Sequence, residues 1–133
     1  MSLLNFRRGA AYFPVADVTK TGDYYRDRLG FLPEYVGGAP PQFAIYSRNG
    51  CALMFRLVSN ADLIRPMEAQ GGTWDAFFWV TAIESLFAEM VRAGADVVYP
   101  IVLQPYGMRE FAVRDCDGHV LGFGEESSHV TTP

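Results

Sequence analysis

Hydrophobic and polar positions near the start of the chain predict a strand followed by a helix. The segment AAYFPV (10–15) has the aromatic and β-branched residues of a strand. In the following VADVTKTGDYYRDRLGF, Asp17 or Thr19 is the expected helix N-cap and Gly30 the C-terminal stop. Gly22 costs this helix about 1 kcal/mol relative to Ala, so we expect the helix to depend on packing against the rest of the fold.

The same block continues with three further strands. A strand is predicted over 32–36, and a hairpin over 42–58 turns at Asn49-Gly50. The order of this block is therefore βαβββ. Residues 59–73, SNADLIRPMEAQGGT, have no sustained period and contain Pro and a Gly pair, so they are interpreted as a linker with at most one helical turn.

The pattern then begins again. WDAFFWV (74–80) is a predicted strand, and Thr81 and Glu84 have the spacing of a capping box before an amphipathic helix that Gly94 ends. A short strand over 96–99 and the loop PIVLQPYGMR precede a second hairpin. The order is again βαβββ.

The two hairpins share one sequence pattern. FAIYSRNGCALMF (43–55) and FAVRDCDGHVLGF (111–123) share Phe, Ala, a β-branched residue, Asn or Asp before Gly, and a final Leu-x-Phe in register. Three matched pairs extend the repeat over both blocks: Val15 with Val80, Gly30 with Gly94, and Gly50 with Gly118. The sequence therefore predicts an α+β fold of two tandem βαβββ modules, over 9–58 and 74–126, that form a curved mixed sheet around a cleft in one domain.

Composition narrows the class of partner. The 133 residues are 50% hydrophobic and 20% charged, with a net charge of −4, which is typical of a globular protein and disfavours nucleic acid. The start, MSLLNFRRG, lacks the order of a signal peptide, and no apolar run approaches the roughly 20 residues that span a bilayer. We therefore expect a cytoplasmic protein without membrane contact, in which Cys51 and Cys116 stay reduced.

Two segments resemble signatures of a known family. VADVTKTGDYYRDRLGF is similar to the opening signature of the vicinal oxygen chelate superfamily, a V-x-D followed by an aromatic-rich helix that ends in LGF. YGMREFAVRDCDGHVLGFGE resembles the closing signature of its glyoxalase and bleomycin-resistance branch, usually written around DPDG, with Cys116 where Pro is common. The resemblance covers residues 9–126 and implies the same two-module fold.

The resemblance also implies where a divalent metal would be held. Enzymes of this superfamily bind it with four side chains, two from each module, at positions that correspond here to Ala10, Met54, Asp75 and Gly122. Ala and Gly have no ligating side chain, and a thioether is a poor ligand for hard divalent ions. We therefore expect no metal cofactor, and the four positions are interpreted as vestigial.

Strand alternation indicates which side chains replace the metal in the cleft. Residues that share a face with the four positions include several aromatic or charged ones, and the predicted ligand-binding cleft consists of Tyr12, Met54, Arg56, Asp75, Phe77 and Trp79. The alternate residues are uniformly apolar and should pack beneath the helices: Phe13, Val15, Leu53, Phe55, Phe78, Val80, Leu121 and Phe123. The same aromatic residues would equally suit a closed cleft or a dimer interface.

The remaining polar residues have less specific interpretations. Asp75 is expected to be solvated or paired with Arg56, and Arg109 to bind Glu110 or a partner surface. Tyr106 and Trp74 are candidates for the rim of the cleft, with no role assigned to Tyr106 or Arg109. His119 is expected at an exposed strand start and His129 in a polar tail, which argues against a histidine-based catalytic pair.

Three functions remain open at this point. The first is a metal-free binder of a small aromatic molecule, such as an antibiotic or metabolite, that acts as a homodimer because its open strands need covering. The second is a lyase, isomerase or dioxygenase of the same superfamily with a displaced or absent metal, in which Asp75 or a Tyr acts as acid or base. The third is a protein-interaction module whose aromatic residues are used by the interface.

Overall fold

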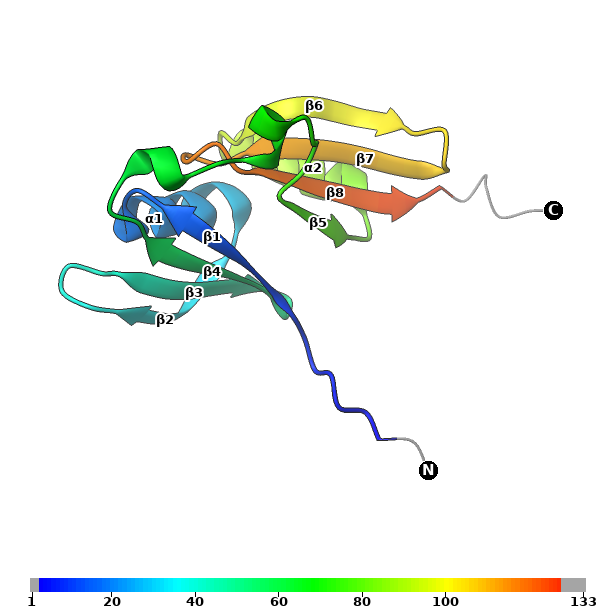
Figure 1. Cartoon of the computed structure of the whole chain (residues 1–133). Coiled ribbons are helices and arrows are strands. Elements are labelled where there is room, and N and C mark those ends of the chain that lie inside the picture. Colours follow the sequence, from blue (N-terminus) through cyan, green and yellow to red (C-terminus); the bar gives the residue numbers. More distant parts are fainter. Residues whose placement is uncertain (1–2, 128–133) are drawn as a thin grey trace. The chain divides into compact units, whose positions relative to one another are not determined.

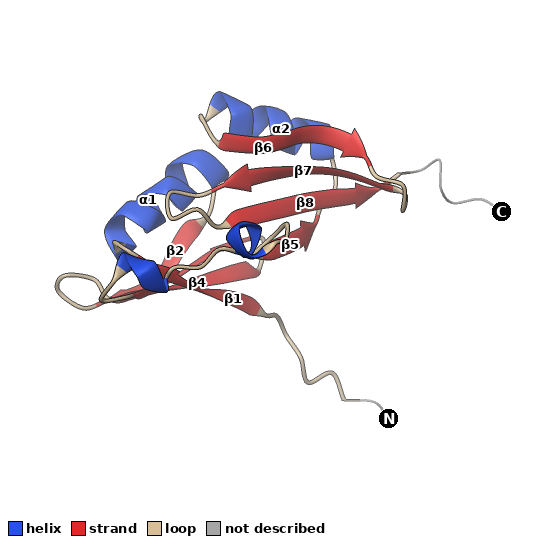
Figure 2. Ribbon diagram, turned by 45° about the horizontal axis from the view of Figure 1, so that its top comes forward, coloured by secondary structure: helices blue, strands red, loops and turns tan. Residues whose placement is uncertain are grey.

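The computed structural model describes residues 3–127, and His129 lies outside them. Its internal contacts divide the chain into a first unit that ends at Ile64 and a second unit that begins at Arg65. Each unit consists of one helix packed on one face of a four-stranded mixed sheet (Figure 1). The second view shows the same arrangement, with α1 and α2 each on one face of its own sheet (Figure 2). This confirms the predicted α+β fold of two βαβββ modules.

The first unit contains the complete first module. Its elements are β1 (Ala10–Val15), α1 (Val18–Leu29), β2 (Leu32–Gly37), β3 (Phe43–Arg48) and β4 (Cys51–Leu57). The strand order is β1-β4-β3-β2, with β1 parallel to β4 and the other pairs antiparallel. The short 3-10 helix η1 (Ala61–Leu63) ends this unit.

Helix α1 forms as its sequence predicts. The Asp17 carboxylate accepts a 2.9 Å hydrogen bond from the Lys20 backbone N–H, and Gly30 takes a left-handed conformation with φ 75°. Gly22 faces the sheet, and a Cβ there would collide with the ring of Tyr46, which is itself buried. The glycine therefore permits the close approach of helix and strand that offsets its low helix propensity.

The second unit repeats this arrangement. Its elements are β5 (Ala76–Trp79), α2 (Ile83–Arg92), β6 (Asp96–Leu103), β7 (Met108–Arg114) and β8 (Val120–Glu126), in the order β5-β8-β7-β6. The 3-10 helix η2 (Met67–Gln70) precedes β5. The ring of Phe111 stacks on Phe123 at 5.0 Å and meets Phe87 of α2 edge-on at the same distance, so the core of this unit lies between helix and sheet.

The predicted capping box at the start of α2 is wrong. The N-cap residue is Ala82, in a left-handed conformation with φ 51°, and it makes no side-chain cap. Instead, the Glu125 carboxylate of β8 accepts hydrogen bonds from the backbone N–H groups of Ala82 at 3.3 Å and Ile83 at 3.1 Å. The carboxylate that caps the positive end of the helix dipole lies 42 residues away in the sequence, so a local capping pattern could not predict it.

Strand β6 is longer than predicted. The expected strand stopped at residue 99, whereas β6 continues through Pro100 to Leu103, with register irregularities on either side of Tyr99. Because β6 lies at the edge of its sheet, the missing N–H of Pro100 removes no necessary ladder bond. The extension brings Val102 alongside Glu110 of β7, which matters for the site described below.

The two hairpins do not repeat in the register that their letters indicate. Ala44 pairs with Phe55 in the first hairpin, whereas Phe111 pairs with Phe123 in the second, so the leading Phe-Ala is displaced by one residue. The cause is turn length: two residues separate Arg48 from Cys51, and five separate Arg114 from Val120. Phe111 is consequently buried beneath α2, and Phe43 lies on the face away from α1.

Candidate functional site

Aromatic rings cover the open face of the second sheet. Trp74 lies against Phe77 with ring centroids 4.7 Å apart, and Phe77 meets Trp79 edge-on at 5.1 Å. Phe77 and Trp79 pair with Gly122 and Gly124 of β8. A Cβ at Gly122 would lie 2.6 Å from the Trp74 ring and 2.7 Å from Phe77, so the glycine allows both rings to lie directly on the strand. Trp79 is 74% exposed and offers a free stacking surface.

A pocket opens beside these rings. Its volume is about 340 Å³, and its wall consists of Thr73, Trp74, Tyr99, Val102, Gln104 and Tyr106. The indole N–H of Trp74 donates a 2.9 Å hydrogen bond to the Tyr99 hydroxyl, which fixes both rings in the wall. The volume is in the range of sites for small ligands or for one part of a drug-sized ligand.

A buried carboxylate lies behind this wall. Glu110 of β7 is 1% exposed, and it pairs with Gly124 on one side and with Val102 on the other. Its Oε1 accepts a 2.9 Å hydrogen bond from the hydroxyl of Tyr106. Glu110 was not among the predicted site residues, although its alternation with Phe111 in MREFAV placed it on the open face. Sequence reasoning considered it only as a neighbour of Arg109.

The pKa values of the two wall tyrosines show the effect of this carboxylate. Burial and the hydrogen bond to Glu110 raise the pKa of Tyr106 to about 12. Burial also raises the pKa of Tyr99, where the charge of Glu110 and a hydrogen bond to it add to the effect and the Trp74 hydrogen bond opposes it. Both phenols are therefore neutral hydrogen-bond donors at physiological pH.

The open face of the first sheet carries a smaller aromatic cluster. The Phe43 ring lies 6.3 Å from Tyr12 and 6.2 Å from Tyr35, and the Arg56 guanidinium lies 4.9 Å from its centroid. The Arg56 Nε also donates a 3.1 Å hydrogen bond to the Tyr12 hydroxyl. Met54, the neighbour of Tyr12 across β1 and β4, is half-buried on the same face.

Comparison with known proteins identifies the family. The profile of the Glyoxalase/Bleomycin resistance protein/Dioxygenase superfamily matches residues 9–123, most of the chain. The chain belongs to this superfamily. The resemblance seen in the two sequence signatures is thereby confirmed.

Several solved structures share the fold of this chain. TioX from Micromonospora sp. ML1 is 24% identical, with a TM-score of 0.73 over 91% of this chain and 99% of its own. The bleomycin-binding protein of Streptomyces verticillus, solved with copper(II)-bleomycin, is 24% identical, with a TM-score of 0.69 over 94% and 100%. A bleomycin resistance determinant encoded on transposon Tn5 is 18% identical, with a TM-score of 0.72 over 91% and 98%. No curated protein matches the sequence.

The positions that hold a metal in enzymes of the glyoxalase superfamily do not fit one here. Ala10 is exposed and has no donor atom, and the space above Gly122 is filled by the rings of Trp74 and Phe77. Met54 contributes only a thioether. Asp75 is the one carboxylate of the four, and its two oxygens each accept a backbone hydrogen bond. These residues therefore cannot form the metal site of the superfamily.

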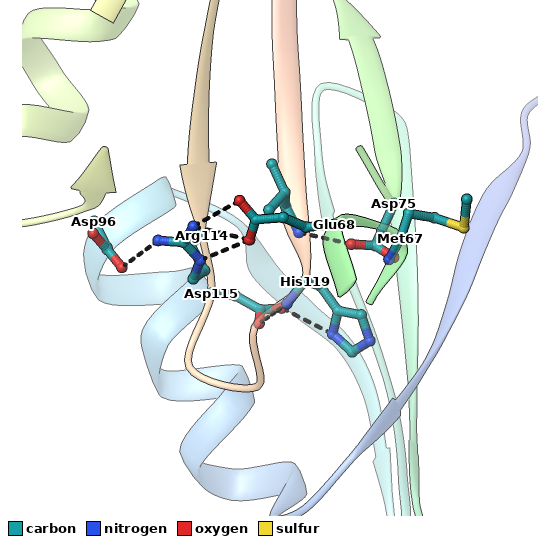
Figure 3. A network of polar contacts seen from close by, with 8 residues as sticks. Met67, Glu68, Asp75, Asp96, Arg114, Asp115 and His119 are labelled. Atoms are coloured by element: carbon teal, nitrogen blue, oxygen red, sulfur yellow. Dashed lines mark hydrogen bonds and ion pairs between the residues drawn. The ribbon is translucent and has the colours of Figure 1, made fainter. Parts of the chain in front are cut away.

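Asp75 instead organises the backbone around the start of β8. Its Oδ1 accepts from the Met67 N–H at 2.9 Å and its Oδ2 from the Val120 N–H at 2.8 Å. Figure 3 shows these bonds beside the Arg114 guanidinium, which binds Glu68 at 2.9 Å and Asp96 at 3.5 Å. The polar network thus ties η2 to β6, β7 and β8. The partners of Arg56 lie within the first unit, as described above.

One group of possible metal ligands occurs in the described part of the chain. The ligand atoms of Asp115, Asp117 and His119 lie within 4.8 Å of one another in the second hairpin turn. Asp115 Oδ1 accepts hydrogen bonds from the Asp117 N–H at 2.8 Å and the His119 N–H at 3.0 Å, which is the geometry of a side-chain-stabilised turn. The group is therefore explained as the structure of the turn itself.

The prediction that His119 is exposed is wrong, because only 2% of the residue is accessible to solvent. The turn folds back so that its Nδ1 lies 3.4 Å from Asp115 Oδ2 (Figure 3). Burial lowers the pKa of His119, but the hydrogen bond and charge of Asp115 and the charges of Asp75 and Asp117 outweigh burial, so the pKa is raised above its ordinary value.

We predict a pH-dependent stability from this histidine. Because its folded pKa is raised above the unfolded value of about 6.5, its protonation contributes stability that is fully present below that pH and is lost as pH rises through the folded pKa. Urea unfolding of the wild type between pH 6 and 9 should show a decline of at most about 1.4 kcal/mol per pH unit from this group. His119→Gln should remove that decline, and an unchanged profile in the variant would contradict the assignment.

Arg109 does not pair with its neighbour Glu110. The two side chains point to opposite faces of β7, and Arg109 forms an ion pair with Glu84 in the first turn of α2. The strand alternation of β7 explains the difference, because adjacent residues of a strand cannot share a face. Arg109 therefore belongs to the helix side of the sheet and not to the aromatic face.

Among the described residues, no helix is both long and apolar enough to cross a membrane.

Proposed function

We propose that this chain is a metal-free small-molecule-binding protein of the glyoxalase/bleomycin-resistance type, and that it holds a flat aromatic ligand on the open face of the second sheet. The observation that carries the proposal is the aromatic surface of Trp74, Phe77 and Trp79, which occupies the position of a metal ligand above Gly122. Offset or edge-on stacking on such rings favours flat, partly polar molecules.

The donor set supports binding over metal chemistry. Only Asp75 among the four superfamily positions is a carboxylate, and its oxygens are engaged by backbone N–H groups. This also disfavours the enzymatic hypothesis in which Asp75 acts as acid or base. The Asp75 carboxylate would first have to break its hydrogen bonds with two backbone N–H groups before it could exchange a proton with a substrate. The bleomycin-binding relative was solved with a copper(II)-bleomycin complex, so a comparable antibiotic or metabolite is a reasonable first ligand to test.

We further propose that the protein acts as a cytoplasmic homodimer. Exposed apolar side chains on the sheet faces opposite α1 and α2, such as Tyr12, Tyr35 and Trp79, suit contact with a second copy or with a ligand held by two copies. Cys51 and Cys116 are exposed and form no disulfide within the described residues, which is consistent with a reducing compartment. Sedimentation of the purified protein tests the oligomeric state.

A screen by melting-temperature shift and calorimetry tests the binding function. The compounds should include flat aromatic molecules and glycopeptide antibiotics of the bleomycin type. We expect at least one to stabilise the wild type, with about tenfold weaker affinity for Trp79→Ala because a stacking partner is lost. Phe6→Ala is the matched control, because Phe6 is a 98% exposed aromatic residue outside both sheets.

Two outcomes would contradict the proposal. If no compound stabilises the wild type, or if Trp79→Ala binds each one as tightly as the wild type does, the aromatic face is not the binding site. If the purified protein retains an equimolar divalent ion after dialysis, and ligand binding disappears when that ion is chelated, the protein is not a metal-free binder.

A further inference from the structure

Glu110 is a buried acid behind the wall of the pocket, and it lacks an ion-pair partner in the described part of the chain. Among the described residues, no Lys, Arg or His forms an ion pair with it. A carboxylate that is 1% exposed has lost its hydration, and such groups are normally compensated by a cation or by several strong donors. Glu110 instead accepts a hydrogen bond from the neutral hydroxyl of Tyr106.

The hydroxyl that donates to Glu110 belongs to the wall of the pocket. Tyr106 donates to Oε1 at 2.9 Å, and the neighbouring Tyr99, which accepts a hydrogen bond from the Trp74 indole, is close enough for Glu110 to raise its pKa. A neutral hydroxyl stabilises a buried carboxylate less than an ammonium group does, because hydrogen bonds between two charged groups are shorter and about twice as strong. A positively charged group in the pocket would therefore stabilise the Glu110 carboxylate more than the present hydroxyl does.

Tyr106 is placed so that it can yield its position. It lies in the turn between β6 and β7, where Gly107 has φ 90° and the Gln104 N–H bonds to the Met108 carbonyl at 2.8 Å. Its ring is 60% exposed, and its hydroxyl makes the contact with Glu110 from the pocket side. A change in the Tyr106 side-chain rotamer alone would open the carboxylate to the pocket without moving the strands.

We propose that Glu110 anchors a protonated amine of the ligand. The amine displaces the Tyr106 hydroxyl and forms an ion pair with Glu110, while the aromatic part of the same ligand stacks on Trp74 and its neighbours. This inference rests on the proposed binding function and specifies its ligand class as a cationic aromatic molecule.

Three features favour an ammonium group over other partners. A single carboxylate with two phenols is too poor a donor set for a bound metal ion. The rings of Trp74, Tyr99 and Tyr106 line the pocket, and aromatic rings attract a cation that lies over their faces. The negative net charge of −4 adds a general attraction for positively charged ligands.

A pair of matched probes tests the anchor. Naphthylethylamine and naphthylethanol have the same flat ring system and the same linker, and differ in whether they end in an ammonium or a hydroxyl group. Calorimetry at neutral pH should show the amine binding to the wild type about tenfold or more tightly than the alcohol. Glu110→Gln, which keeps the shape of the side chain, should reduce this preference to about one.

Two further variants separate an anchor from a merely structural residue. Glu126→Gln removes the same charge from an exposed residue on the same strand face, two residues from the Gly124 partner of Glu110, and should keep the preference for the amine. Tyr106→Phe removes the competing hydroxyl and should increase amine affinity a few-fold while leaving alcohol affinity nearly unchanged. Melting temperatures confirm that each variant is folded.

The outcomes distinguish this inference from the function on which it rests. Equal binding of both probes by the wild type, with loss of both in Trp79→Ala, would overturn the Glu110 anchor and leave the aromatic site intact. Failure of both probes while the broader screen yields ligands would also overturn the anchor. A retained amine preference in Glu110→Gln would place the cationic subsite elsewhere.

Discussion

Phe111→Ala is expected to lower the free energy of unfolding by about 4 kcal/mol, the range found when a fully buried aromatic side chain is truncated. Phe111 is 0% exposed, stacks on Phe123 and meets Phe87 of α2. Its removal would leave a cavity at the centre of the second unit, between helix and sheet. Urea unfolding followed by circular dichroism measures the change.

The matched control is the other Phe that begins the same repeated motif. Phe43→Ala should cost about 1 kcal/mol, because Phe43 is half-buried on the open face, where it contacts Tyr12, Tyr35 and Arg56. If the letters were in structural register, the two truncations would have similar effects. Equal losses of stability would therefore contradict the one-residue displacement between the hairpins.

This displacement shows what the repeat could and could not predict. The repeated letters correctly indicated two modules with the same order of elements, because hydrophobic periodicity and glycine stops are local features. They could not indicate on which face of the sheet each side chain lies, because in β7 this depends on the length of the turn that joins β7 to β8. A turn of five residues instead of two shifts the pairing and sends Phe111 and Phe43 to opposite faces.

Errors at the helix and edge strand have a similar origin. Thr81 and Glu84 satisfied a local capping pattern, but Glu125 of β8 forms the cap because the sheet places it there. Pro100 suggested a loop, yet an edge strand tolerates a residue without an N–H. The capping pattern fails because another strand supplies the cap. The proline signal fails because an edge strand does not need the hydrogen bond that proline lacks.

The candidate site was predictable in part. Strand alternation from Asp75 selected Phe77 and Trp79, and the structure places both rings on the face of the sheet opposite α2. Glu110 was missed because the reasoning followed the four metal positions, none of which lies on β7. Its signal was a charged residue between Met108 and Ala112, the apolar residues on the same face of the strand, and a known register would have shown it as a buried acid.

The absent metal ligands and the aromatic face have one physical explanation. A ligating side chain at position 122 would require the space in which the Trp74 and Phe77 rings now lie, since even a Cβ would approach them to 2.6 Å. Glycine at this position is therefore a condition for aromatic packing on the strand. This position of the sheet has room for aromatic rings or for a ligating side chain, but not for both. In this chain the rings of Trp74 and Phe77 occupy it.

Asp75→Ala is expected to lower the free energy of unfolding by about 3 kcal/mol, because two hydrogen bonds to a charged acceptor are lost and two backbone N–H groups are left without it. The bonds join Met67 of η2 and Val120 of β8 to the same carboxylate. Amide exchange at these two residues should accelerate in the variant, which a residue that served only to bind ligand would not cause.

Two comparisons make the assignment of Asp75 as a structural residue decisive. Asp75→Asn keeps one acceptor oxygen but directs an N–H₂ group at the second backbone N–H, so we expect an intermediate loss of about 1–2 kcal/mol. Asp62→Ala removes an equal charge from an exposed residue of η1 and should change stability by no more than about 0.5 kcal/mol. If Asp75→Ala unfolds like the wild type but loses ligand binding, Asp75 belongs to the binding site. If it unfolds at lower urea concentration than the wild type, Asp75 is a structural residue that holds η2 and the start of β8 together.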